Sequence, residues 1–161
     1  LQSSIDKMAA SAIRADYVVS MANGSPLSPD VAKKIAATDG VSASSPLRNA
    51  ETRIDGTTEY VTGVDGASIA ELTDLKVDRG SFTIGGDRVV VDKVRAEEYG
   101  WKTGSHFTTH FEDGKAQTLT VAGIYDGNDM IRGIMLDNKV LTPHLSRPTD
   151  MQVMVKTANG A

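Results

Sequence analysis

The sequence predicts an α+β fold with mixed sheets in two subdomains. β-Branched runs typical of strands alternate with short amphipathic segments that are bounded by helix-capping residues. Asp-Gly pairs at 55–56 and 113–114 separate extended segments, where their tolerance of positive φ suits tight hairpin turns. At 161 residues the chain can bury roughly two thirds of the surface that its unfolded form would expose. A stable core is therefore expected.

Residues 1–15 predict a stalk-like N-terminal helix, because apolar side chains recur within it at helical spacing. Its apolar stripe consists of Ile5, Met8, Ala12 and Ile13. Such a helix could continue a membrane span outward and couple movement to the domain. An ordinary surface helix that packs on its own core explains the same pattern, and the sequence leaves both alternatives open.

The next segment predicts a strand over 16–21 and a well-signalled helix. Ser28 is the expected N-cap of this helix and Pro29 its first residue, while Asp39-Gly40 ends it. Ile35 should face the core. Residues 41–47 are then extended, and a hairpin follows in which 51–54 pair with 57–64.

The rest of the chain predicts further short elements. They are a helix over 67–73, a strand over 88–91, a helix from the cap Asp92 to the stop Gly100, a hairpin of 105–111 with 117–125, a strand within 130–136, a helical turn within 138–145 and a strand over 151–157. We expect residues 16–66 and 137–161 to form a small layered α/β subdomain. Residues 67–136 should form a β-rich subdomain inserted into it.

Composition narrows the range of functions. The net charge is −4 and no Lys or Arg cluster occurs, which argues against nucleic acid as a partner. The chain has no Cys, so disulfides, thiol catalysis and the commoner zinc sites are excluded. No apolar run approaches the roughly 20 residues that cross a bilayer. Because the chain begins at Leu1, we expect a piece of a longer protein.

Catalytic, cofactor and metal motifs are not found in the sequence. It contains no nucleophile elbow, phosphate-binding loop or dinucleotide fingerprint. His106 and His110 lie in an expected strand, where their spacing separates them by roughly 13 Å, too far for one metal ion. We therefore expect no catalytic residue, no cofactor and no metal ion in this chain.

One apolar run could contact a partner. Met-rich segments next to a turn form adaptable surfaces, and large aromatic side chains can anchor a partner. The candidate contact residues are Met130, Ile131, Ile134, Met135 and Trp101. The alternative is that residues 130–136 form a buried strand and that Trp101 packs in the core.

Four short patterns occur in an order that resembles a known family. They are ADYVV at 15–19, RGSF at 79–82, VVV at 89–91 with glycines at 100 and 104, and VAGI at 121–124. In this order, over 15–157, the chain resembles the MacB-like periplasmic core domain of MacB/FtsX-type ABC transporter permeases. The patterns concern fold spacing, and none is a catalytic signature.

The resemblance implies a non-catalytic, soluble extracytoplasmic domain of a permease in the cell membrane, placed between two transmembrane helices. Its partners would be these helices and a cytoplasmic ATPase, together with a second permease copy. The domain would couple ATP-driven helix movement to export of a peptide or lipid, or to control of an external partner such as a cell-wall hydrolase. The alternatives are a small secreted hydrolase and an extracellular binding module.

Overall fold

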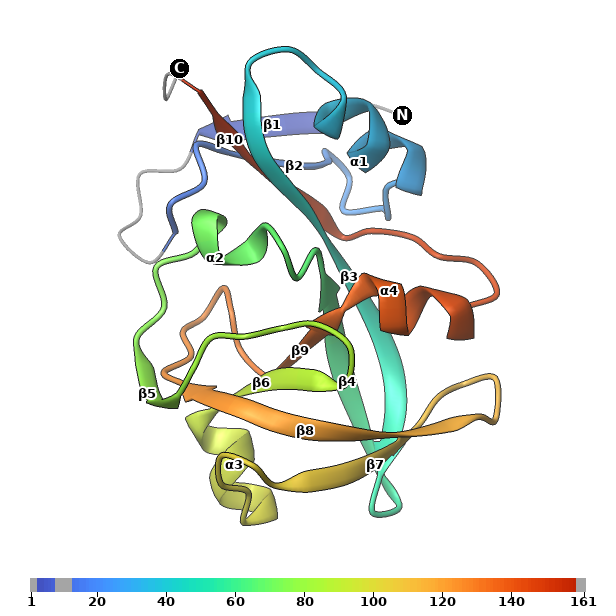
Figure 1. Cartoon of the computed structure of the whole chain (residues 1–161). Helices are drawn as coiled ribbons and strands as arrows, with labels where there is room; N and C mark the ends of the chain where they lie inside the picture. The colour runs from blue at the N-terminus through green and yellow to red at the C-terminus, as the bar shows by residue number, and fades with distance from the viewer. Residues whose placement is uncertain (1–2, 8–12, 159–161) are drawn as a thin grey trace.

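The computed structural model describes residues 3–7 and 13–158 (Figure 1). In chain order its elements are β1 (Ser3–Lys7), β2 (Tyr17–Met21), α1 (Pro29–Ala36), β3 (Val41–Ile54), β4 (Thr57–Val64), α2 (Ile69–Leu72), β5 (Val77–Gly80), β6 (Arg88–Asp92), α3 (Lys93–Tyr99), β7 (His106–His110), β8 (Ala116–Tyr125), β9 (Ile134–Asp137), α4 (Asn138–Leu141), the 3-10 turn η1 (Thr142–His144) and β10 (Gln152–Thr157).

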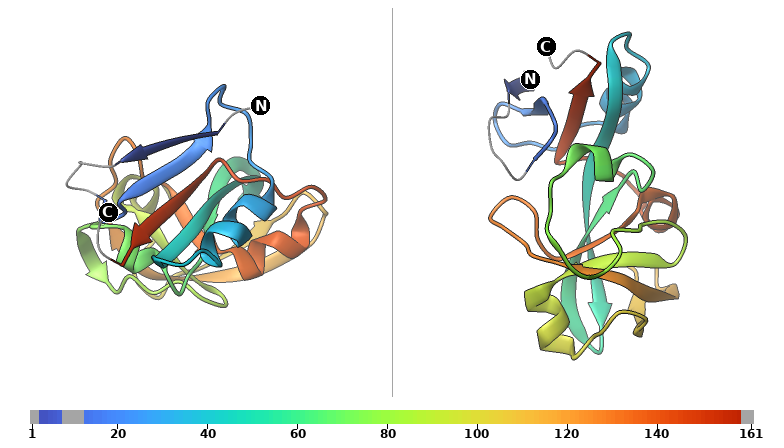
Figure 2. Two further views of the ribbon diagram at one scale, coloured as in Figure 1. Left: turned by 90° about the horizontal axis from the view of Figure 1, so that it is seen from above. Right: turned by 60° about the vertical axis from the view of Figure 1, so that its left-hand side comes forward.

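The strands form one mixed sheet, which confirms the predicted α+β class. Its order is β1-β2-β10-β3-β4-β9-β6-β8-β5, and β7 pairs with both β3 and β8. The pairs β4–β9 and β6–β8 are parallel, and the other pairings are antiparallel. The chain is elongated, with β1, β2, β10 and α1 at one end and the β7–β8 hairpin and α3 at the other (Figures 1 and 2).

Strand β3 belongs to both ends of the molecule. Its first half pairs with β10 through residues 41–47, and its second half pairs with β4 through residues 48–54. Beyond this junction the pairings run β3-β4-β9-β6-β8-β7 and return to β3 through Arg53 opposite His110. The far end is therefore a closed ring of six strands, a small barrel whose interior side chains fill.

Three hydrophobic clusters follow this layout. The barrel interior packs residues such as Ile54, Leu119 and Ile134, all fully buried. A second cluster around Leu72 and Tyr125 lies beneath α2 and joins the barrel to Met154 of β10. The third places α1 against β2 and β10. Ile35 is only half-buried there, because α1 packs on the open face of a narrow sheet.

Most of the predicted turns and caps are confirmed, although α1 ends at Ala36, before the predicted stop at Asp39-Gly40. Asp55 and Gly56 have φ angles of 51° and 76° between β3 and β4, which is the geometry of a tight hairpin turn. The Ser28 side chain accepts a hydrogen bond from the backbone N–H of Asp30. Helix α3 begins at its cap Asp92 and ends at Gly100, which has a φ of 69°.

The predicted N-terminal helix is wrong where the structure describes it. Ser3–Lys7 is a strand whose backbone pairs antiparallel with Tyr17–Met21, so Ile5 belongs to β1. Met8 and Ala12 lie outside the described residues. Ile13 is buried, at 7% exposure, and bridges to Thr73. Sheet hydrogen bonds along the free edge of β2 have overridden a local helical pattern.

Two other points bear on the expected organisation. The proposed division at 66/67 and 136/137 stays a prediction, and the observed pairing of β4 with β9 crosses it. Strand β5 was not predicted; it pairs with β8 at the edge of the sheet.

Within the described parts of the chain, no helix has the length and apolar character that a membrane span requires.

Candidate groove at the sheet junction

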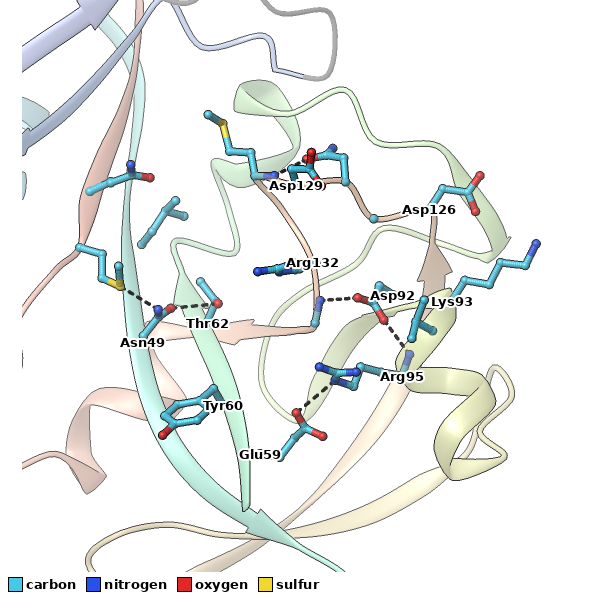
Figure 3. Close-up of a pocket in the computed structure, with 18 residues that line it drawn as sticks. Asn49, Glu59, Tyr60, Thr62, Asp92, Lys93, Arg95, Asp126, Asp129 and Arg132 are labelled. Carbon is cyan, nitrogen blue, oxygen red and sulfur yellow. Dashed lines mark hydrogen bonds and ion pairs between the residues drawn. The ribbon is translucent and has the colours of Figure 1, made fainter. Parts of the chain in front are cut away.

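A groove of about 1220 Å³ opens where β3 leaves β10 and enters the barrel (Figure 3). One wall consists of Asn49 on β3 and Tyr60 and Thr62 on β4. The other wall consists of the first turn of α3 and the loop 126–133 that precedes β9. Met151 and Gln152 close it at the β10 side. The groove exists because β9 fills the space between β4 and β6 only from Ile134 onward.

Glu59 on β4 is the main polar support of the groove. Glu59 is 9% exposed, and both of its carboxylate oxygens accept hydrogen bonds. Oε2 accepts a hydrogen bond from Arg95 Nε at 3.1 Å, and Oε1 accepts one from the Tyr99 hydroxyl at 2.9 Å. Arg95 also donates to Glu98 at 3.2 Å. This network spans the gap between β4 and α3, so it fixes the width of the groove.

Asp92 holds the opposite wall in place. Its Oδ1 accepts from the backbone N–H of Arg95 at 2.7 Å, and its Oδ2 accepts from the backbone N–H of Gly133, also at 2.7 Å. The carbonyl of Gly133 accepts from the backbone N–H of Asp92 and from the Tyr125 hydroxyl. One buried carboxylate therefore caps α3 and fastens the end of the loop 126–133.

These contacts change proton affinities. Burial opposes the charge of Arg95, but the carboxylates of Glu59, Glu98 and Asp92 outweigh it and raise the pKa of the guanidinium. Burial, followed by the hydrogen bond to Glu59, raises the pKa of Tyr99 to about 12. Burial also raises the pKa of Tyr125, and the charge of Asp92 adds to this effect. The guanidinium of Arg95 is therefore charged, and the hydroxyls of Tyr99 and Tyr125 are neutral, at neutral pH.

The network is structural in character. The carboxylates of Glu59 and Asp92 accept hydrogen bonds from neighbouring protein groups, so neither is placed as a free base. Among the described residues, no group of three His or acidic side chains is arranged to hold a metal ion. His106 and His110 lie exposed on β7, where His106 contacts the Thr120 hydroxyl at 2.9 Å. The side chains of the groove are therefore arranged to support a binding surface.

The predicted contact residues divide between the groove and the core. Met130 is 46% exposed and lines the groove. Ile131, Ile134 and Met135 are at most 6% exposed, which agrees with the alternative that this segment is buried. Ile134 and Met135 lie on the central strand β9, and Ile131 packs into the second hydrophobic cluster from the loop before it. Trp101 is half-buried and stacks between Tyr99 and Phe107, with ring centroids 4.4 and 4.1 Å away, so it packs against the barrel core.

Sequence reasoning missed most of the groove. Glu59, Tyr60, Arg132 and Met151 were not singled out. One signal was available, because strand alternation puts Glu59 on the same inward face as Val61. A charged residue on the apolar face of a strand needs a buried partner. That partner, Arg95, lies 36 residues away, and only the folded chain shows it.

Comparison with known proteins identifies the family of this chain. The family model described as MacB-like periplasmic core domain matches residues 1–161. The chain belongs to this family. It is thus a periplasmic-type domain of an ABC transporter permease. A search among curated proteins gave no match.

Solved structures of MacB-type domains share the fold. One is the periplasmic region of MacB from Actinobacillus actinomycetemcomitans, with 13% identity, a TM-score of 0.61, and 84% of this chain and 66% of that chain covered. Another is the extracellular domain of the noncanonic ABC-type transporter YknZ from Gram-positive bacteria, with 14% identity, a TM-score of 0.58, and 83% and 74% covered. The chain therefore spans about two thirds to three quarters of these structures.

Proposed function

We propose that this domain couples ATP-driven movement of membrane helices to an event outside the membrane. That event is export of a peptide or lipid, or control of an external partner. The domain itself is non-catalytic and lies on the extracytoplasmic side of the cell membrane. Its partners are the transmembrane helices of the same permease, a cytoplasmic ATPase and a second permease copy. Membership of the MacB-like family supports this setting.

The observation that carries the proposal is the course of β3. Both described ends of the chain enter one part of the sheet, where β1 and β10 flank β2 (Figure 1). Strand β3 starts beside β10 and continues without a break into the barrel. At the junction, Arg48 donates to the buried Asp150 at 2.8 Å and to Thr142 at 2.7 Å. A displacement of the terminal strands is thereby passed to the barrel as a rigid movement.

A precise excision tests this proposal. Leu47 lies opposite Gln152 across the β3–β10 pair. Residues 48–151 can be replaced by an Asn-Gly turn, which joins these two residues without changing the register of the strands. In the full-length permease with its ATPase, we expect ATP hydrolysis to persist and the external activity to be lost.

The control is the full-length permease with Arg147→Gln, an exposed change inside the excised segment. It should keep both activities. Abundance in the membrane and association with the ATPase are measured for each variant. An excised permease that assembles normally and keeps its external activity would show that the barrel takes no part in coupling.

A further inference from the structure

Exposed apolar side chains gather around the groove. Among the described residues, the large hydrophobic side chains that remain exposed are Tyr60 at 65%, Val94 at 59%, Met151 at 54%, Met130 at 46% and Val77 at 37%. All except Val77 line the groove. An apolar patch of this kind marks an interaction site. Methionine side chains adapt to irregular partners, and tyrosine offers a broad face with a polar tip.

The centre of the groove holds a guanidinium, that of Arg132. The carboxylate of Glu59 pairs with Arg95, that of Asp92 accepts hydrogen bonds from two backbone N–H groups, and Asp126 lies 3.9 Å from Lys76. Arg132 projects between the two walls (Figure 3), exposed and without an ion pair in the part of the chain that the structure describes. A guanidinium in this position binds a carboxylate through two parallel hydrogen bonds.

The remaining free charges lie at the ends of the groove. Lys93 belongs to the first turn of α3, and Asp129 belongs to the tip of the loop (Figure 3). The charge at the centre therefore selects an acidic group, and Lys93 adds to this preference at one end. Asp129 disfavours further acidic groups at the other end, which fixes the direction of an asymmetric occupant.

The walls favour a polypeptide over an acyl chain. Asn49, Thr62 and Gln152 add amide and hydroxyl groups to the lining that also holds Tyr60 and Met151. The Thr62 hydroxyl donates to Asn49 Oδ1 at 3.1 Å. Backbone amides of an extended peptide can pair with such groups while alternate side chains meet apolar ones. An acyl chain needs an enclosed apolar pocket, whereas this groove is open and its walls are partly polar.

We infer that the groove binds an extended polypeptide segment in which a carboxylate is flanked by apolar side chains. The carboxylate pairs with Arg132, and the apolar side chains lie against Tyr60, Met130 and Met151. The inference rests on the proposed function for its biological setting, since the segment would belong to an exported peptide or to the external partner. Binding itself is measured on the 161-residue chain, independently of any transport assay.

The test begins with selection of octapeptides from a random library on the immobilised chain. We expect the enriched peptides to contain Asp or Glu between apolar residues. Binding is then followed by the methyl resonances of the six methionines. Those of Met130 and Met151 should shift, while those of Met135 and Met154, which are at most 2% exposed, should not.

Matched substitutions examine the ion pair. Arg132→Gln in the chain, or Glu→Gln in the selected peptide, should each weaken binding about tenfold or more. The two changes together should weaken it little further, because they remove the same contact. Arg147→Gln lies outside the groove and should leave the affinity unchanged. Tyr60→Ala should also weaken binding, and being exposed it should leave the melting temperature nearly unchanged.

Several results would overturn the inference. They are failure to enrich any peptide, enrichment of basic peptides, equal effects of Arg132→Gln and Arg147→Gln, and methyl shifts confined to other methionines. Stronger binding to vesicles of anionic phospholipid than to the selected peptides would point to a lipid instead. Because the excision experiment measures transport, it can succeed or fail regardless of these outcomes.

Discussion

At the scale of single residues, a few buried polar side chains decide how the parts of the chain are joined. Arg48 and Asp150 form an ion pair in which the side chains are 8% and 0% exposed. They lie 102 positions apart and meet where β3 passes from the terminal strands into the barrel. Burial of two charges is tolerated here because each neutralises the other and Thr142 accepts a further hydrogen bond.

We predict that Asp150→Leu destabilises the chain by about 3–5 kcal/mol, since it leaves Arg48 buried without a counter-charge. The double variant Arg48→Met/Asp150→Leu should recover most of this loss. Asp74→Leu, which breaks a pair whose side chains are more than half exposed, should cost at most about 1 kcal/mol. Chemical denaturation measures all three, and equal costs for Asp150→Leu and Asp74→Leu would contradict the role of the junction.

Tyr99 reports on the network beside the groove. Its phenolate should form with a midpoint near pH 12, measured as the difference in ultraviolet absorbance between the wild type and Tyr99→Phe. Glu59→Gln removes the negative charge and leaves only a neutral amide oxygen as acceptor, so the midpoint should fall towards the ordinary value of 10.0, while burial keeps it above that value. An unchanged midpoint would show that Glu59 does not act on Tyr99.

The direction of the linkage follows from this raised pKa. The folded state holds the phenolic proton more tightly than the unfolded state does. The stabilisation is therefore complete below about pH 10 and is lost as the pH rises towards 12. Tyr99→Phe should remove this part of the pH dependence and leave the remainder.

At the scale of elements, close backbone approach explains two of the glycine patterns that mark the family. Gly80 of β5 lies opposite Gly123 of β8. A Cβ at Gly123 would meet the backbone of Ser81, and one at Gly80 would meet the carbonyl of Ala122. The patterns at 79–82 and 121–124 are therefore two sides of one contact, in which edge strand β5 turns across β8.

Gly123→Ala should consequently destabilise the chain by about 1–3 kcal/mol or more, because the backbone must shift to admit the methyl group. Gly85→Ala is the matched control, since a Cβ there meets nothing within 4 Å and its φ is not positive. It should be neutral or slightly stabilising. Thermal and chemical denaturation give both values. Similar costs for the two changes would argue against the close contact.

At the scale of the whole molecule, β3 makes the two ends one cooperative unit. If β3 unfolds, the terminal strands lose a neighbour because β3 pairs with β10, and the barrel ring opens because β3 pairs with β4. The second hydrophobic cluster also spans both ends, from Val90 to Met154. Neither end can unfold without exposing apolar surface of the other.

We therefore predict a single unfolding transition, with coincident midpoints by circular dichroism, by Trp101 fluorescence and by the methyl signal of Met154. The calorimetric and van't Hoff enthalpies should agree. Trp101 reports on the barrel and Met154 on the junction with β10. Two separated midpoints would show that the ends are independent subdomains, as the proposed division at 66/67 and 136/137 would allow.

The sequence by itself determined those features of this protein that depend on interactions between residues close in the chain. The Asp55-Gly56 turn, the Ser28 and Asp92 caps, the Gly100 stop and the strands from 88 onward depend on neighbours within a few residues, so they could be predicted from the chain alone. The order of these signals also indicated the family. Other features depend on partners distant in sequence: the strand at Ser3–Lys7, the burial of Met135, the Glu59–Arg95 bridge and the Arg48–Asp150 pair. Only the tertiary structure decided these, because a backbone edge, a core or a counter-charge supplied by a remote segment outweighs local propensity.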